Sequence, residues 1–161
     1  MASDILIREA RLVDAEALFE AHQDSVSKLC AGAYSEVQLA TWFEDRSPDI
    51  YWPAIEARQI WLAEQNGRVL GFVGFAPGEV TLLFVRQEAA GRGLGKRLFA
   101  FGVAKAESGF KGPLTVVATQ NSQRFYQGHG FLPVEEETFV RGKAEIQFKV
   151  IKMQRGVAAE S

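Results

Sequence analysis

Hydrophobic residues in the first part of the chain alternate weakly with polar ones and then recur at helical spacing. Residues 4–9 show the weak alternation and predict a strand. Asp14 follows as a candidate helix N-cap, and the helical pattern after it ends at Gly32. The residues on the helical face are Leu18, His22, Val26 and Leu29. A second helix is predicted from Ser35, because Gln38 three residues later completes a capping box.

The middle of the chain changes to the spacing of strands. Two strand-like segments, residues 60–65 and 69–76, are separated by an Asn-Gly pair, which is a strong hairpin signal. A Pro-Gly turn then leads into residues 79–85, EVTLLFV. This run is almost continuously hydrophobic, so we expect it to lie in the centre of a sheet.

The second half of the sequence predicts a glycine-rich loop, followed by both helices and strands. The expected elements are a helix from Leu94 to Gly109, a strand at 114–118, a short helix at 122–127, and a hairpin of 138–140 with 145–153. The whole order is strand, two helices, three strands, helix, strand, helix and two strands. We therefore predict a mixed α/β sheet of about seven strands with four helices, in one domain over residues 1–161.

Composition excludes several classes of protein. A formal net charge of −2 at pH 7 argues against nucleic acid as the main partner. The single cysteine, Cys30, fits a reducing compartment, and two histidines with one cysteine predict no metal site. The N-terminal residues do not resemble a secretory signal, and no hydrophobic run has the length of a membrane span. We expect a cytoplasmic protein.

The loop at residues 89–101, AAGRGLGKRLFAF, carries glycine at alternate positions directly before a helix. It does not match a dinucleotide fingerprint, because Lys96 stands where the third glycine belongs. It does not match a nucleoside-triphosphate loop either, because Arg97 stands where serine or threonine belongs. The loop still has the features that both kinds of phosphate-binding motif share, which are free N–H groups, a helix N-terminus and basic residues. Together with Arg86 and Arg92, these features predict a pyrophosphate site.

Two motifs resemble the Gcn5-related N-acetyltransferases (GNATs). VRQEAAGRGLGKRL, residues 85–98, is similar to motif A of that family, and NSQRFYQGHGF, residues 121–131, is similar to its second motif. The predicted order of elements is that of the GNAT fold over nearly the whole chain. Residues 25–35 also resemble the acceptor-side helices of one bacterial subgroup. The sequence departs from motif A at Ala90, usually Gln or Arg, and at Gln87, often Pro. Because backbone amides do most of the phosphate binding, we expect the change at Ala90 to weaken the site without abolishing it.

The resemblance implies acetyl-coenzyme A as co-substrate, with no metal. The implied contacts come from the central strand, the loop and the short helix: Leu83, Phe84, Val85, Gly91, Arg92, Gly93, Leu94, Gly95, Lys96, Asn121 and Tyr126. In this scheme the Leu83 N–H meets the acetyl carbonyl, and the Val85 backbone pairs with the pantetheine arm. The resemblance also implies a small-molecule or peptide amine as acceptor, and it allows a homodimer.

Tyr126 is the candidate general acid. Acetyl transfer to an amine leaves a thiolate that must gain a proton, and a phenol with a pKa near about 10 is protonated at neutral pH. In the family, a tyrosine at this place in the second motif points at the sulfur. The alternative is a core aromatic residue with a polar tip, although we expect Phe125 to be the more buried of the pair.

The base that deprotonates the amine stays open at this point. Glu79 begins the hydrophobic strand, and alternation with a period of two places it on one side with Thr81, Leu83 and Val85. Histone-type family members carry a base at the same offset. His22 has a suitable intrinsic pKa but lies on a hydrophobic helix face, and a water chain would serve as well. Cys30 is expected to be a small buried thiol.

The acceptor pocket is predicted only coarsely. The resemblance puts Trp42, Tyr51 and Trp52 where GNATs build it, and the glutamates at 135–137 are expected to form a solvated run. The function implied is an N-acetyltransferase that acts on a primary amine by direct attack in a ternary complex. The alternative is a coenzyme-A-binding regulatory module without turnover.

Overall fold

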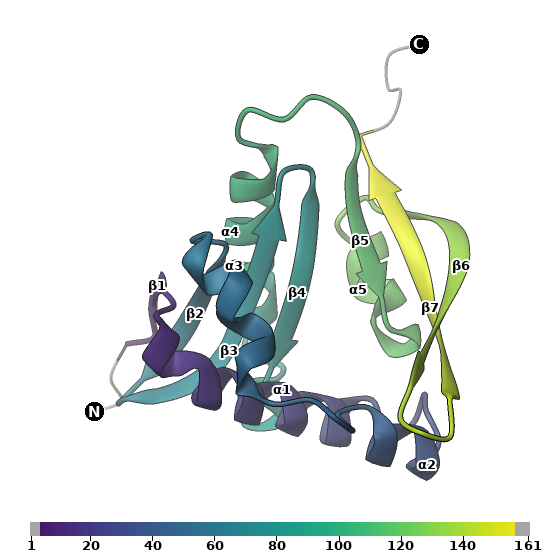
Figure 1. Cartoon of the computed structure of the whole chain (residues 1–161). Helices are drawn as coiled ribbons and strands as arrows, with labels where there is room; N and C mark the ends of the chain where they lie inside the picture. Colours follow the sequence, from purple (N-terminus) through teal and green to yellow (C-terminus); the bar gives the residue numbers. More distant parts are fainter. Residues whose placement is uncertain (1–3, 157–161) are drawn as a thin grey trace.

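The computed structural model describes residues 4–156, which form a seven-stranded mixed sheet (Figure 1). The strand order is β1-β2-β3-β4-β5-β7-β6, so the hydrophobic strand β4 is central, as its composition predicted. The strands are β1 Leu6–Glu9, β2 Ile60–Gln65, β3 Arg68–Ala76, β4 Glu79–Val85, β5 Leu114–Ala118, β6 Leu132–Arg141 and β7 Ile146–Arg155. The remaining ends of the predicted domain, 1–3 and 157–161, lie outside the described residues.

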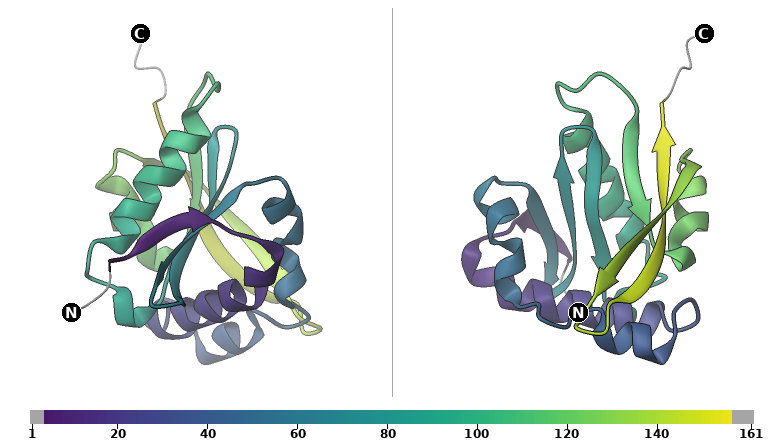
Figure 2. Two further views of the ribbon diagram at one scale, coloured as in Figure 1. Left: turned by 90° about the vertical axis from the view of Figure 1, so that its left-hand side faces the viewer. Right: turned by 45° about the vertical axis from the view of Figure 1, so that its right-hand side comes forward.

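Helices cover both faces of the sheet. The helices are α1 Ala15–Leu29, α2 Glu36–Thr41, α3 Trp52–Glu56, α4 Leu94–Glu107 and α5 Gln123–Gln127. α1 and α3 lie on one face and α4 and α5 on the other (Figures 1 and 2). The predicted mixed α/β fold is confirmed, and its four helices are present as α1, α2, α4 and α5. The additional helix α3 is only five residues long and begins at a proline-containing turn, so hydrophobic periodicity could not reveal it.

Each face of the sheet has its own hydrophobic core. On the α4 and α5 face, the fully buried Leu98, Phe99 and Phe131 pack against the sheet. On the α1 and α3 face, Leu18 and Phe72 are fully buried. A third cluster joins α1 and α2 to β7, and its buried residues are Val26, Cys30, Tyr34, Trp42 and Phe148.

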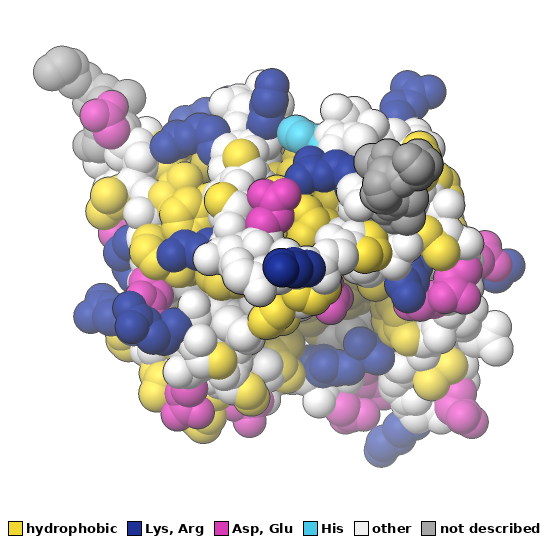
Figure 3. All heavy atoms as spheres, turned by 90° about the horizontal axis from the view of Figure 1, so that it is seen from above, with side chains coloured by type: hydrophobic (Ala, Val, Ile, Leu, Met, Phe, Trp, Pro, Cys, Tyr) yellow, Lys and Arg dark blue, Asp and Glu magenta, His cyan; other side chains and the backbone are white. Residues whose placement is uncertain are grey.

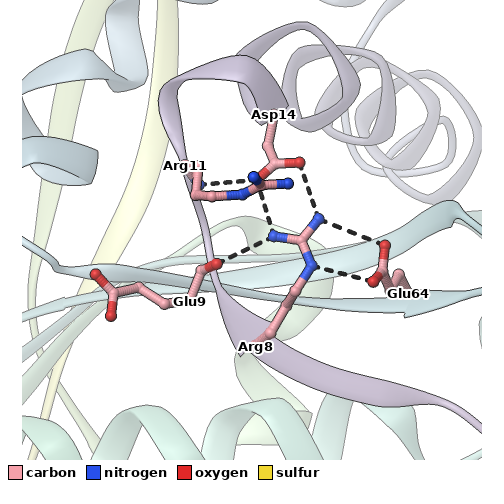
Figure 4. A network of polar contacts seen from close by, with 5 residues as sticks. All are labelled: Arg8, Glu9, Arg11, Asp14 and Glu64. Carbon is pink, nitrogen blue, oxygen red and sulfur yellow. Dashed lines mark hydrogen bonds and ion pairs between the residues drawn. The ribbon is translucent and has the colours of Figure 1, made fainter.

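The first strand is held to the sheet by a charged network (Figure 4). The guanidinium of Arg8 donates to Asp14 at 2.9 Å and to Glu64 at 3.0 Å. Asp14 precedes α1 as predicted, but its carboxylate makes no capping hydrogen bond to the helix. It accepts instead from Arg8 and from the backbone N–H of Arg11 at 2.8 Å. In contrast, the capping box predicted between Ser35 and Gln38 at α2 is present.

Candidate active site

The sheet is interrupted between its two parallel strands. β4 pairs with β5 only at Glu79↔Thr115 and Val80↔Val116, and within residues 4–156 the ladder goes no further. Figure 1 shows the two strands diverging toward their carboxyl ends. Because a buried strand edge leaves its N–H and C=O groups in need of partners, this seam is suited to an extended ligand.

A cavity of about 200 Å³ occupies the seam. It is lined by α1, β4, β5, the start of α4 and the segment from 119 to 126: Ser25, Leu29, Cys30, Val80, Thr81, Leu82, Leu83, Phe84, Val85, Gly95, Val117, Thr119, Asn121, Ser122, Phe125 and Tyr126. Six residues implied as cofactor contacts therefore lie together here: Leu83, Phe84, Val85, Gly95, Asn121 and Tyr126. Ser25, Val117, Thr119 and Ser122 also line the cavity but were not predicted as contacts. Ser25 and Ser122 lie in the segments quoted for the resemblance, but which of their side chains reach the cavity depends on how distant elements pack.

The glycine loop has the backbone that its sequence requires. Gly91 and Gly93 have φ angles of 80° and 79°, in the left-handed region that favours glycine. Gly93 is the N-cap of α4, and the first helical bond runs from the Arg97 N–H to its carbonyl at 3.1 Å. The N–H groups of Leu94, Gly95 and Lys96 therefore belong to the first turn, where a helix supplies no acceptors.

Open space surrounds the same loop. A Cβ atom added at Gly91 or Gly93 would meet nothing within 4 Å. The side chains of Arg92, Lys96 and Arg97 are exposed around it, and none of the three has an ion-pair partner among the described residues. Backbone donors, the positive end of the α4 dipole and these cations form a site for an anion.

Arg86 does not belong to this basic group, contrary to the sequence prediction. Its Nε donates to the Val69 carbonyl at 2.8 Å, and its guanidinium lies 3.8 Å from Glu20. Only 8% of the residue is exposed. Arg86 therefore holds the start of the loop against β3, while its charge is directed into the protein.

Tyr126 reaches the cavity from α5. Its ring packs edge-on against Phe99, Phe125 and Phe131. Its hydroxyl makes no hydrogen bond to any described residue, and burial raises the pKa of the phenol well above its usual value. The residue is 7% exposed, whereas Phe125 is only partly buried, so the expectation that Phe125 is the deeper of the two is wrong. Tyr126 is therefore a core aromatic residue that also lines the cavity.

The carboxyl end of α1 closes the cavity opposite β4. Cys30 is 4% exposed, as predicted, and burial raises the pKa of its thiol. Asn121 donates through Nδ2 to the Leu29 carbonyl at 3.2 Å. Tyr34 gives its hydroxyl proton to the Lys149 carbonyl at 2.8 Å and accepts from the Gln120 N–H at 3.1 Å. These bonds fix α1, β7 and the segment before α5 around the cavity.

A β-bulge changes which way the Glu79 side chain faces. Gly74 pairs with Leu82 and Phe75 with Val80, so Thr81 is an extra residue in β4. Strict alternation is lost at this point, and Val80 packs in the α4-side core together with Leu83 and Val85. The prediction that Glu79 shares a side with Leu83 and Val85 is therefore wrong. Because neighbouring residues of a strand point to opposite faces, and Val80 points to the α4 face, the Glu79 side chain lies on the α1 face.

Glu79 lines a second, polar cavity of about 410 Å³ next to the first. Glu137 and Lys152 line it as well, and Val117 belongs to both cavities. Burial raises the pKa of Glu79, the nearby charge of Glu137 raises it further, and Lys152 acts in the opposite direction. Figure 3 shows the molecule from above, hollowed on one side, with hydrophobic and basic side chains next to the hollow.

His22 is sealed beneath β4. Its Nδ1 lies 2.7 Å from the Tyr51 hydroxyl, and its ring lies 3.8 Å from that of Phe84. Nε2 is buried without a hydrogen-bond partner in the part of the chain that is described. Burial, with a smaller contribution from the charge of Arg46, lowers the pKa of His22 to about 3. A neutral ring with no access to the cavity does not suit a base that must reach an amine.

The aromatic residues proposed for the acceptor pocket separate into two groups. Tyr51 is 2% and Trp42 is 8% exposed, and both are packed in cores, whereas Trp52 is 50% exposed on α3. None of the three lines either cavity. Within residues 4–156, no group of three or more His, Cys, Asp or Glu residues could hold a metal ion. None of the described helices is long and hydrophobic enough to cross a membrane.

A family model described as an acetyltransferase (GNAT) domain matches residues 30–152. This range is well over half of the chain and includes the glycine loop, the diverging strands and Tyr126. No curated protein matches the sequence.

Solved structures share the fold over almost the whole chain. A GCN5-related N-acetyltransferase from Rhodopseudomonas palustris aligns with a TM-score of 0.81 at 22% identity, covering 98% of each chain. The PaiA N-acetyltransferase of Thermoplasma acidophilum, in complex with coenzyme A, gives 0.73 at 21% identity, covering 94% of this chain and 98% of its own. Salmonella typhimurium yncA, with its cofactor acetyl-CoA, gives 0.70 at 22% identity, covering 99% and 97%.

Proposed function

The chain belongs to the GNAT acetyltransferase family, and we propose that it transfers an acetyl group from acetyl-coenzyme A to a primary amine. One observation carries the proposal: the anion site at the glycine loop, the unpaired edge of β4 and the Tyr126 hydroxyl are parts of one seam. The transfer would be a direct attack of the amine in a ternary complex, so the main contribution of the protein is to position the two substrates.

The glycine loop fits the pyrophosphate of coenzyme A. The site provides N–H donors, three exposed cations and a backbone free of side chains at Gly91 and Gly93. Ala90 supplies no side-chain donor, so the amides of the loop and of the first turn of α4 would hold the phosphates, with Arg92 adding charge. The structures of the Thermoplasma and Salmonella proteins contain coenzyme A or acetyl-CoA, which supports this assignment.

The free edge of β4 fits the pantetheine arm. The amide groups of that arm can pair with an unpaired strand edge in the way that a peptide adds to a sheet. Leu83 and Val85 lie on this stretch, and both line the cavity. We propose that the Leu83 N–H meets the acetyl carbonyl, where it would stabilise the negative charge that develops on oxygen. Asn121 is bonded to Leu29, so its part would be to order the cavity wall.

Tyr126 is proposed as the general acid. When acetyl-coenzyme A is bound, the reaction breaks the bond from the acetyl carbon to sulfur, and the departing thiolate must take up a proton. Tyr126 lines the cavity, its hydroxyl has no hydrogen-bond partner among the described residues, and its raised pKa keeps it protonated near neutral pH.

Glu79 is proposed as the group that receives the proton of the attacking amine. The carboxylate lies in the second cavity, which meets the first at Val117, so the transfer would pass through water. The pKa of Glu79 is raised toward neutral pH, which suits a general base. His22 does not suit this role, because Nε2 is buried and burial lowers the pKa of the ring to about 3, which makes it a weak proton acceptor.

Thiol release in the presence of a panel of amines, with peptide N-termini included, tests the function. We expect amine-dependent release of coenzyme A and formation of the acetylated amine. Coenzyme A should also raise the melting temperature, because a ligand that binds only the native state stabilises it. A melting shift without turnover on any amine would instead identify a coenzyme-A-binding regulatory module. A shift with ATP or NAD and none with coenzyme A would contradict the assignment of the seam.

A further inference from the structure

Arg141 differs from the other partly buried arginines. The side chains of Arg8, Arg86 and Arg155 are 25%, 9% and 31% exposed, and each has a carboxylate within 4 Å. Arg141 is also partly buried, but it has no carboxylate partner among the described residues. Its hydrogen bond goes to the Val140 carbonyl at 3.0 Å. Withdrawing a guanidinium from water without a counter-charge is unfavourable, so the position indicates a missing anion.

The structure brings a second unpaired arginine to the same place. Glu44, after α2, contacts the turn between β6 and β7: its carboxylate accepts from the Lys143 N–H at 3.4 Å and fills the space beside Gly142. This contact docks the hairpin end, where Arg141 lies, on the loop that carries Arg46. The charge of Arg46, after burial, lowers the pKa of Arg141. Arg46 has no carboxylate within 4 Å in the described part of the chain.

Arg141 shares a strand face with Glu137, which lines the second cavity. Alternation along β6 puts Glu137, Phe139 and Arg141 on one face of the strand. Glu137 lines the second cavity together with Glu79. The Arg141 guanidinium lies 4.4 Å from the Phe139 ring, and that ring is stacked on Phe148 at 5.0 Å. The face therefore passes from a carboxylate through an aromatic surface to an uncompensated guanidinium.

Core packing connects the strand face that carries Glu137, Phe139 and Arg141 to the seam. Phe148 and Phe84 pack in one cluster, and Phe84 also lines the first cavity. His22 stacks on Phe84 at 3.8 Å and lies within the electrostatic influence of Arg46. The strand face that carries Arg141 is therefore connected to the seam through the Phe148 and Phe84 cluster, although neither Arg141 nor the exposed Arg46 lines either cavity.

We propose that Arg46 and Arg141 bind an anionic group of the acceptor, a carboxylate or a phosphate, so that the substrate is an amine with a distant negative charge. This inference rests on the proposed acetyl transfer and names the acceptor class for it. Two guanidinium groups suit such oxyanions because their planar donors bind in pairs. The aromatic surface of Phe139 would cover the hydrocarbon portion in between.

The length of the face sets the length of the acceptor. Arg141 follows Glu137 by four positions along β6, which is about 13 Å at the rise of an extended strand. An α-amino acid, whose amine and carboxylate are adjacent, cannot bridge the two ends. An acceptor with five or more carbons between the amine and the anion can approach this span.

Matched amines test the proposal with the wild-type enzyme. We would measure kcat/KM for glycine, 4-aminobutanoate, 6-aminohexanoate and 8-aminooctanoate, each beside the alkylamine of equal length, and for 6-aminohexyl phosphate. We expect the acids to exceed their alkylamines by about 10-fold or more at the two longer lengths, the scale of a charge-assisted hydrogen bond. Glycine should show no advantage. The carboxylate and phosphate arms identify which anion is preferred.

Three variants connect the preference to these arginines. Arg141→Met keeps the length and the packing on Phe139 but removes the charge, and Arg46→Gln removes the other charge. Each should raise KM for 6-aminohexanoate about 10-fold, with hexylamine unchanged. Arg11→Gln, which removes an exposed arginine before α1, is the control and should change neither substrate.

The outcomes separate the two proposals. Turnover of alkylamines equal to that of the acids at every length, or an undiminished preference for acids in Arg141→Met, would overturn the anion site and leave acetyl transfer intact. Absence of turnover on every amine, with a melting shift by coenzyme A, would contradict the proposed function itself. In that case, a further shift by 6-aminohexanoate that Arg141→Met abolishes would still support the anion site, and no further shift would refute it.

Discussion

The two edges of β4 have opposite characters. Along one edge, β4 pairs with β3 from Ala76↔Glu79 to Gly71↔Val85, and this ladder contains a single bulge. Along the other edge, pairing with β5 stops after Val80↔Val116. The first edge belongs to the closed half of the sheet, where His22 and Phe72 are sealed. The second edge is the seam, where the proposed cofactor and acid groups meet, and Glu79 lies in the adjoining cavity.

The difference shows how one fold serves both stability and binding. A complete ladder satisfies its backbone groups internally and leaves nothing for a ligand to add. An interrupted ladder keeps donors and acceptors available at a fixed spacing, and the closed half holds them in place. We therefore expect changes at the closed edge to alter the free energy of unfolding, and changes at the seam to alter binding and turnover.

The largest expected effect comes from Gly93→Val at the phosphate end of the seam. The φ angle of 79° disfavours a β-branched residue, and the side chain would fill the space where the phosphates would lie. We expect coenzyme A to bind at least about a thousandfold more weakly, which is about 4 kcal/mol. Isothermal titration calorimetry and the loss of the melting shift would measure the change.

Gly109→Val is the matched control for that variant. Gly109 follows α4 with a φ angle of 72° and likewise has nothing within 4 Å of an added Cβ. The backbone strain is comparable, so the melting temperature should fall by a similar amount in both variants. Only Gly93→Val should lose affinity for coenzyme A. Equal affinities in the two variants would mean that the glycine loop does not hold the cofactor.

Tyr126→Phe should have the next largest effect. Removing the hydroxyl removes the proposed proton donor and keeps the ring against Phe99 and Phe131. Because the hydroxyl has no hydrogen-bond partner within residues 4–156, the melting temperature and the affinity for coenzyme A should change little. We expect kcat to fall about a hundredfold with KM unchanged, since the interaction strengthens as charge develops on sulfur. A thioester donor with an activated leaving group should recover most of the loss.

Tyr34→Phe is the comparison variant for Tyr126→Phe, because the Tyr34 hydroxyl holds neighbouring segments together by hydrogen bonds. Its hydroxyl bonds to both Lys149 and Gln120, so its removal should cost about 1–3 kcal/mol of unfolding free energy. Denaturant unfolding of both variants compares the two tyrosines directly. Wild-type turnover in Tyr126→Phe would leave that residue with a packing role, and water would then protonate the sulfur.

His22 provides a test at the closed edge, through the pH dependence of stability. Its folded pKa of about 3 lies below the usual 6.5, so the unfolded chain binds the proton more readily between those values. Stability from this group is present above pH 6.5 and is lost as the pH falls toward 3. From pH 7 to pH 5, the free energy of unfolding should fall by about 2 kcal/mol more in wild type than in His22→Gln. This difference is a change of about thirtyfold in the folding equilibrium constant. Parallel losses in the two proteins would show that the ring is not sealed.

The glycine loop and the fold could be predicted from the sequence because their determinants are local. Gly91 and Gly93 need their own backbone angles, and the capping box at Ser35 needs only a neighbour three residues away. Hydrophobic periodicity likewise depends on the element itself. These features do not require any knowledge of which strands become neighbours.

The remaining features depend on contacts between distant segments. The bulge at Thr81 reverses the side on which Glu79 lies, and its position is visible only in the register with β3. Arg86 looks like part of the basic loop until its bond to the Val69 carbonyl is seen. Arg46 and Arg141 are far apart in the chain, and only the docking of the hairpin turn on Glu44 relates them.

The smallest expected effect concerns Glu79, which the bulge moves to the second cavity. If Glu79 accepts the amine proton through water, Glu79→Gln should lower kcat by about tenfold, less than a direct base would lose, because water remains in place. The wild-type rate should rise with pH through a pKa above the usual 4.5, and this limb should be absent in the variant.

Glu137→Gln is the informative comparison, since the charge of Glu137 helps to raise that pKa. It should shift the wild-type limb to lower pH and keep the plateau rate. An unchanged pH profile in Glu79→Gln would assign the limb to the acceptor amine and remove Glu79 from the mechanism.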